Sequence, residues 1–173
     1  MAFEVISSDD LIDSVTKVKL LNLLSLSAFK MAEGQSIDLS IVSKDVDIEL
    51  LNNLHKKKTG SLLNCSVMFG AILNPNISQK DLSILDSFSN HIGLAYQVQD
   101  DVLDVITSDE ILGKRQNSDL VKNKPSYPSI LGLDESIKKY ESLYREALDE
   151  ISLLSADEKP LRDLTDKLMK RTF

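Results

Sequence analysis

Apolar residues recur at helical spacing along almost the whole chain, and this pattern predicts an all-α protein. The longest such segment covers residues 78–106, and the strict apolar–polar alternation of strands is hard to find anywhere. Gly (6) and Pro (4) are too scarce for a β-sandwich or barrel with many tight turns. The 173 residues are enough for one domain with a hydrophobic core and few for two.

Turn and cap signals divide the chain into further helices. Residues 14–37 are dense in leucine and carry apolar groups on nearly all sides, which favours a buried helix. A polar loop is expected at 107–125. The predicted N-caps are Ser78, Asp134 and Asp157. The other expected elements are helices at 45–56, 60–73, 134–153 and 157–171, a turn at 74–76 and a short apolar turn at 126–132.

Composition excludes several classes of function. The net charge of −7, from 20 basic and 27 acidic residues, argues against electrostatic binding to nucleic acid. The single cysteine, Cys65, cannot form an internal disulfide, and the two histidines have no metal-ligand spacing. No signal peptide or membrane span is expected, and these features together predict a cytoplasmic protein.

Residues 97–104 (QVQDDVLD) place polar side chains along one stripe of the longest predicted helix. At about 100° per residue, Gln97, Asp100 and Asp104 share a stripe about 60° wide with Gly93, and Asp101 flanks it. Apolar residues border the stripe, with Ile92, Tyr96, Leu103 and Ile106 on one side and Leu94, Val98 and Val105 on the other. Carboxylates between apolar walls are costly, and two of them one turn apart repel unless a cation joins them. A hard ion such as Mg²⁺ suits these oxygen ligands, whereas the alternative is a solvated acidic helix end.

Basic residues follow this acidic stripe. Lys114, Arg115, Lys122 and Lys124 would suit a diphosphate bridged by Mg²⁺, and the alternative is a surface loop of mixed charge. Lys58 and Thr59 are expected at the start of a helix, where a hydroxyl and free backbone N–H groups form an anion site or an ordinary cap. Gln35 and Asp38 either line the same cavity or end the helix before them.

Several of these segments together resemble the trans-polyprenyl diphosphate synthases, and most closely the bacterial farnesyl diphosphate synthases. The resemblance covers about residues 1–170 and rests on the order and spacing of several motifs. They are residues 34–35 (GQ) with Asp38, 55–60 (HKKKTG), 93–104 (GLAYQVQDDVLD), 112–116 (LGKRQ), Asp119 and 124–128 (KPSYP).

The resemblance implies a helical bundle around a central cavity and a Mg²⁺-dependent condensation of an allylic diphosphate with isopentenyl diphosphate. Asp100, Asp101 and Asp104 match the family's second aspartate-rich motif, whose first Asp is the direct Mg²⁺ ligand. Lys58, Lys114 and Lys124 match lysines near the allylic diphosphate. Thr59 and Gln97 match polar residues beside the reacting carbons, and Gln35 and Asp119 match supporting positions. Homodimers are expected for the full-length enzyme.

The sequence also departs from the family pattern. The first DDxxD motif and the residues that bind isopentenyl diphosphate and set product length are missing, so residues 1–173 look like the C-terminal part of a single synthase domain with an incomplete bundle. Glu33 replaces a usual glycine and puts a bulky acid near the cavity wall. We therefore expect a prenyltransferase part that is inactive alone. The alternatives are a non-catalytic module that binds diphosphate and Mg²⁺, or a partner subunit of a full synthase.

Overall fold

The structure is a computed structural model that describes residues 1–42, 44–112 and 125–170. Those ranges contain helices and no strand, which confirms the all-α prediction. Among the described helices, none is both long and apolar enough to cross a membrane. The elements are α1 (Ala2–Ser8), α2 (Ser14–Ser40), α3 (Ile48–His55), the π-helix η1 (Lys56–Gly60), α4 (Ser61–Ile72), α5 (Gln79–Leu112), α6 (Tyr127–Leu131), α7 (Leu133–Ile151) and α8 (Lys159–Met169).

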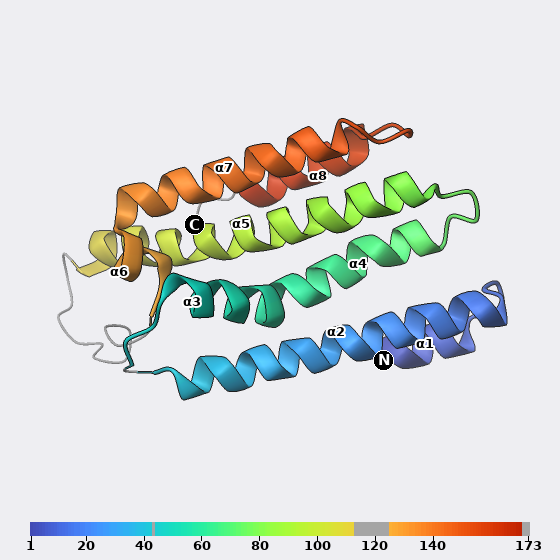
Figure 1. Ribbon diagram of the computed structural model, residues 1–173, viewed down its shortest axis with the longest axis horizontal. Helices are drawn as coiled ribbons and strands as arrows, with labels where there is room; N and C mark the ends of the chain where they lie inside the picture. Colours follow the sequence, from blue (N-terminus) through green and yellow to red (C-terminus); the bar gives the residue numbers. More distant parts are fainter. Residues whose placement is uncertain (43, 113–124, 171–173) are drawn as a thin grey trace.

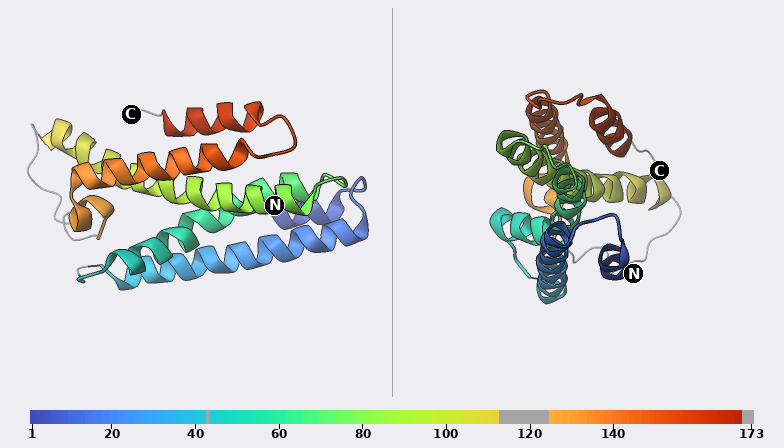
Figure 2. Two further views of the ribbon diagram at one scale, coloured as in Figure 1. Left: turned by 45° about the horizontal axis from the view of Figure 1, so that its top comes forward. Right: turned by 90° about the vertical axis from the view of Figure 1, so that its right-hand side faces the viewer.

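The long helices lie side by side in a row, in the order α7, α5, α3–η1–α4 and α2 (Figure 1). Viewed from one end, α1 and α8 lie on the same side of this row (Figure 2). Helix α5 packs most extensively on α7 and also contacts α3, η1, α4, α6 and α8. The helix that carries the acidic stripe is therefore the central element of the described fold.

Two groups of buried side chains hold the row together. The smaller group joins α1, α2 and α4 through Ile6, Leu20, Leu24 and Cys65, so that Cys65 is a small core residue. The larger group joins α5 to α3, α6, α7 and α8. Its buried members are Leu51, Phe88, Ile92, Leu94, Ala95, Val98, Tyr127, Leu143, Ala147, Ile151 and Met169.

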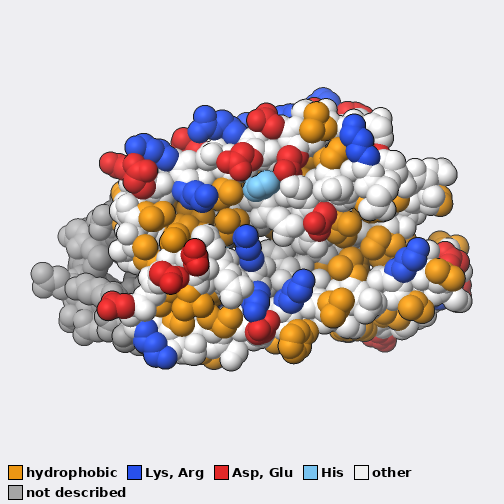
Figure 3. Space-filling view, viewed as in Figure 1, with side chains coloured by type: hydrophobic (Ala, Val, Ile, Leu, Met, Phe, Trp, Pro, Cys, Tyr) orange, Lys and Arg blue, Asp and Glu red, His pale blue; other side chains and the backbone are white. Residues whose placement is uncertain are grey.

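The prediction that residues 14–37 form a buried helix is wrong for one face of α2. In the described structure α2 packs against α1, α3, η1 and α4, and these neighbours cover only part of its circumference. Figure 3 shows hydrophobic side chains at the surface over this helix. The large apolar side chains of α2 that are at least half exposed are Val15, Val18, Leu26, Phe29 and Leu39.

The predicted start of the long helix is confirmed, and its predicted end is too early. The Oγ atom of Ser78 accepts a hydrogen bond from the backbone N–H of Asp81 at 2.9 Å, as an N-cap does. The helix continues to Leu112, into the segment that was expected to be a loop. Polar composition alone therefore did not mark the end of α5.

The two other predicted N-caps are wrong. Helix α7 begins at Leu133, directly after Gly132, because Gly132 adopts a φ of 84° that joins α6 to α7 without a longer turn. Asp134 therefore lies inside the first turn of α7. Helix α8 begins at Lys159, and Asp157 instead accepts a hydrogen bond from the Lys159 N–H in the preceding turn.

Two glycines allow α2, η1 and α5 to approach one another at the backbone. A Cβ atom at Gly34 in α2 would lie 2.4 Å from the backbone nitrogen of Lys58. A Cβ atom at Gly93 in α5 would lie 3.1 Å from the Cα atom of Gly60. The π-helix is thus held between α2 and α5, with the side chain of Lys58 at α2 and that of Thr59 at α5.

The contact at Gly34 can be tested with a matched pair of substitutions. We expect Gly34→Ala to lower the free energy of unfolding by about 1–3 kcal/mol, because the new methyl group overlaps the backbone at Lys58. Gly70→Ala, in α4, should instead raise it by about 0.5–1 kcal/mol, since no atom lies within 4 Å of the new Cβ and alanine favours helix. Urea unfolding measures both, and equal effects would contradict the proposed contact.

Candidate active site

The basic segment at residues 56–60 is a π-helix in the middle of a longer helix. Helices α3, η1 and α4 follow one another without a break, so Thr59 is not at a helix start with free N–H groups, as the sequence suggested. A π-helical turn inside an α-helix is frequent at functional sites. Here its consecutive side chains contact different neighbours: Lys57 and Lys58 contact α2, and Thr59 contacts α5.

Lys58 forms an ion pair with Asp38 at the end of α2. The Lys58 Nζ atom lies 2.5 Å from Asp38 Oδ2, and the Asp38 side chain is only 9% exposed. Gln35, one turn earlier on α2, is half-buried. The structure thus brings Asp38, which the sequence assigned to a helix end or a cavity wall, into direct contact with the predicted phosphate-binding lysine.

Glu33, which departs from the family pattern, has a partner of opposite charge on η1. Its carboxylate pairs with Lys57 Nζ at 2.8 Å, and both side chains are partly exposed. The neighbouring lysines of η1 therefore pair with two acids on α2, one near the surface and one buried.

A chain of hydrogen bonds connects Thr59 to the acidic stripe. The Thr59 hydroxyl donates to Gln97 Oε1 at 2.9 Å, and Gln97 Nε2 donates to Asp101 Oδ1 at 3.3 Å. The other Asp101 oxygen accepts from the backbone N–H of Tyr127 at 3.0 Å. Three predicted site residues from η1 and α5 are therefore joined, and α6 is attached to them through Tyr127.

His55 and Tyr127 both contact Asp101, where this chain of hydrogen bonds ends. Neither residue was assigned a role in the site from the sequence. Their rings stack with centroids 5.6 Å apart, and His55 Nε2 lies 3.4 Å from Asp101 Oδ2. The Tyr127 hydroxyl donates to Asn52 Oδ1. Burial, together with the charge of Asp101, raises the pKa of the Tyr127 hydroxyl well above its usual value, so it stays a donor. The motifs HKKKTG and KPSYP contain both residues, and that was the only signal that could have identified them.

Asp100, Asp101 and Asp104 differ in their surroundings. Asp101 is 12% exposed and engaged as described, Asp100 is half-buried, and Asp104 is exposed. Among the side chains that the structure describes, no three His, Cys, Asp or Glu groups are close enough to hold a metal ion. Asp100 and Asp104 are oxygen donors of the kind Mg²⁺ prefers, and one turn apart they fit part of a coordination shell that water and phosphate would complete.

The other predicted residues cannot be placed. Lys114, Asp119 and Lys124 fall at positions 113–124, outside the described residues. The residues that the structure does bring together are Asp38, Lys58, Thr59, Gln97 and Asp101.

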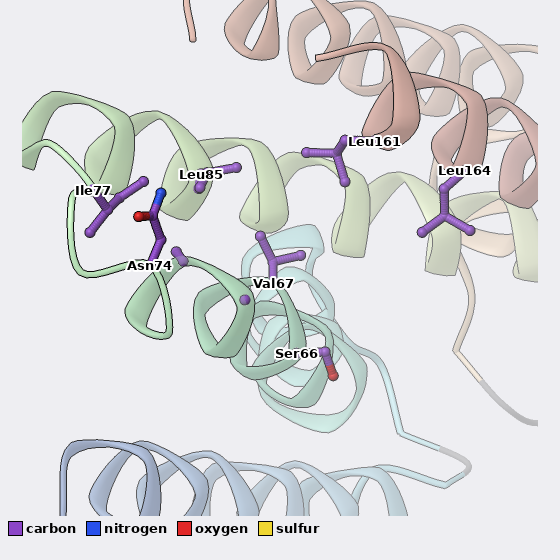
Figure 4. A pocket seen from close by; sticks show the side chains of 9 residues that line it. Ser66, Val67, Asn74, Ile77, Leu85, Leu161 and Leu164 are labelled. Carbon is purple, nitrogen blue, oxygen red and sulfur yellow. The ribbon is translucent and has the colours of Figure 1, made fainter. Parts of the chain in front are cut away.

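A separate apolar pocket of about 430 Å³ lies between α4, α5 and α8 (Figure 4). Val67, Leu85, Leu161 and Leu164 are among its lining residues. None of its lining residues belongs to the predicted site, so this pocket is distinct from the Thr59–Gln97–Asp101 chain.

Comparison with known proteins identifies the family. Residues 1–159 match the Polyprenyl synthetase family. The chain belongs to this family. It is 33% identical to the farnesyl diphosphate synthase of Escherichia coli (strain K12), over 99% of this chain and 60% of that protein. It is 39% identical to the geranylgeranyl diphosphate synthase of Cyanophora paradoxa, over 92% of this chain and 53% of that protein.

Solved structures of this family have the same fold. A geranyltransferase from Helicobacter pylori complexed with magnesium and isoprenyl diphosphate superposes with a TM-score of 0.79 at 28% identity, over 97% of this chain and 55% of that one. A geranyltransferase from Legionella pneumophila gives a TM-score of 0.83 at 26% identity, over 99% and 56%. The chain thus spans 53–60% of the length of these four relatives.

The two lysine pairs of η1 should differ in their contribution to stability. Lys58→Met removes a charged hydrogen-bond donor from the buried carboxylate of Asp38, and we expect the free energy of unfolding to fall by about 1–3 kcal/mol. Lys57→Met removes a partly exposed pair and should cost about 0–1 kcal/mol. Urea unfolding at pH 7 compares the two, and a larger loss for Lys57→Met would contradict this assignment.

Proposed function

We propose that this chain supplies the second aspartate-rich motif and part of the diphosphate site of a short-chain prenyltransferase similar to farnesyl diphosphate synthase. The reaction is the condensation of an allylic diphosphate with isopentenyl diphosphate in isoprenoid biosynthesis. The observation that carries the proposal is that, in a member of the Polyprenyl synthetase family, Thr59 is hydrogen-bonded to Gln97 and through it to Asp101 of α5, while the adjacent Lys58 pairs with Asp38.

Each part of the site has a chemical task in this reaction. Asp100 and Asp104 would hold Mg²⁺, which when bound neutralises the charge of the leaving diphosphate. Lys58 adds positive charge to the same diphosphate, as Lys114 and Lys124 would. Thr59 and Gln97 offer oxygen atoms next to the carbons where positive charge develops. Gln35 and Asp119 would support the cavity around these groups.

We further propose that the 173-residue chain is inactive by itself. It contains one aspartate-rich motif, at residues 100–104, whereas the reaction needs a diphosphate enclosed by charge on more than one side. A carbocation that is open to water is quenched before it can be attacked by a second substrate. We also propose that the full-length enzyme is a homodimer.

A second candidate function is that of a partner subunit without complete catalytic machinery. Among the relatives, an Arabidopsis thaliana protein named as the large subunit of a heterodimeric geranylgeranyl pyrophosphate synthase is 35% identical over 164 residues, which is 90% of this chain and 44% of that protein. That name indicates a subunit that pairs with a different kind of chain, so the proteins that this chain matches include a subunit of a heterodimer.

Binding of inorganic pyrophosphate with Mg²⁺ tests the proposed site directly. We expect calorimetry to show Mg²⁺-dependent binding, and Asp100→Ala should weaken it about tenfold or more, equivalent to about 1.4 kcal/mol, because a metal ligand is lost. Asp149→Ala, an exposed acid on α7, is the matched control and should leave binding unchanged. If Asp100→Ala unfolds the chain, as circular dichroism would show, Asp100 is structural, and if the variant stays folded with binding unchanged, Asp100 is not a metal ligand.

An assay of turnover tests the proposed inactivity of the chain. With geranyl and isopentenyl diphosphates and Mg²⁺, the chain alone should form no product, and clear turnover would refute the proposed inactivity. Binding without turnover agrees with both the prenyltransferase part and the partner subunit. Absence of Mg²⁺-dependent binding would favour a helical bundle without a diphosphate ligand.

A further inference from the structure

Asp101 uses both of its carboxylate oxygens within the protein. Oδ1 accepts from the Gln97 side chain at 3.3 Å, and Oδ2 accepts from the backbone N–H of Tyr127 at 3.0 Å. Tyr127 is fully buried and stacked on His55, so its N–H is a fixed donor. The Asp101 carboxylate is therefore held on both of its oxygens by donors within the protein.

An ionised carboxylate can only accept hydrogen bonds, and this decides how the next two groups are oriented. The amide of Gln97 must point its NH₂ group at Asp101, which directs its Oε1 atom toward Thr59. The Thr59 hydroxyl must then donate its single proton to Gln97, as the 2.9 Å contact requires. The lone pairs of the Thr59 oxygen are left pointing away from Gln97.

We propose that Asp101 is a positioning residue that sets the direction of this hydrogen-bond chain, so that Thr59 presents oxygen lone pairs to the reacting group. The proposal rests on the proposed function, in which positive charge develops beside Thr59 and Gln97. A lone pair aimed at that charge stabilises it, whereas an O–H proton in the same place opposes it. Asp101 therefore acts through Gln97 and Thr59 and not as a direct ligand of Mg²⁺.

One substitution should reverse the direction of these hydrogen bonds without removing any of the side chains that form them. In Asp101→Asn, the carbonyl oxygen of the new amide must face the Tyr127 N–H, because a backbone N–H can only donate. Its NH₂ group then faces Gln97, whose amide turns over and points its own NH₂ group at Thr59. Thr59 becomes an acceptor, and its proton turns away from Gln97.

A second substitution restores the original direction. When Asp101→Asn is combined with Gln97→Glu, the new carboxylate at position 97 accepts from the new amide on one side and from the Thr59 hydroxyl on the other. Thr59 is again a donor, although the two side-chain types have changed places. A residue that served only to hold the fold would not be rescued by this exchange.

Nuclear magnetic resonance of the 173-residue chain can follow both side chains. In Asp101→Asn we expect a stronger nuclear Overhauser effect between the Gln97 amide protons and the Thr59 methyl group, and a shifted Thr59 Cβ resonance. The Cβ resonance should return in the double variant, and Asp104→Asn, one turn away and exposed, should leave both signals as they are. Unchanged signals in Asp101→Asn would overturn the proposal.

The wild-type chain keeps the proposal testable if Asp101→Asn fails to fold. A strong Overhauser effect from the Gln97 amide protons to the Thr59 methyl group in the wild type would already contradict the inferred direction. With Mg²⁺ and inorganic pyrophosphate added, the amide should keep its orientation, and its reversal would show that Asp101 turns to the metal. The ligand-free signals do not depend on binding, so failure to bind pyrophosphate removes the proposed function and not this result.

Discussion

The close approach of three backbones at the π-helix is the constraint on which the site depends. Gly34 and Gly93 remove the side chains that would separate α2 and α5 from η1. Only at this distance can Lys58 pair with Asp38 and Thr59 bond to Gln97. The electrostatic features of the site are therefore a consequence of packing between glycines, because η1 carries both the lysine that pairs with α2 and the threonine that bonds to α5.

Helical periodicity was sufficient to predict the fold class and most helices, because it records which face of each helix meets the core. It could not show that one face of α2 is exposed, since an apolar side chain looks the same in a sequence whether or not a neighbour covers it. Ser78 was recognised as a cap, whereas Asp134 was misassigned because Gly132 begins the helix earlier through its positive φ. Helix propensity depends on nearby residues in the sequence, whereas a junction such as the one at Gly132 depends on how the whole chain packs.

For the site, the sequence indicated residue types and spacing but no partners. The i, i+4 relation of Gln97 and Asp101 is a property of one helix and could be derived. The contacts of Asp101 with Tyr127 and His55 join segments far apart in the chain, and no periodicity contains that information. The π-helix was also missed, because its five residues look like an ordinary basic turn between two helices.

The π-helix has a consequence for how this region can vary. A π turn holds more residues than an α turn, so a chain shortened by one residue at positions 56–60 could continue as a regular α-helix. Helices α3 and α4 would keep nearly the same orientation, because the wider turn already accommodates the additional residue, but the side chains within residues 56–60 would be rearranged and Thr59 would no longer be held against Gln97. The number of residues in this segment is therefore itself a requirement for the contact between Thr59 and Gln97.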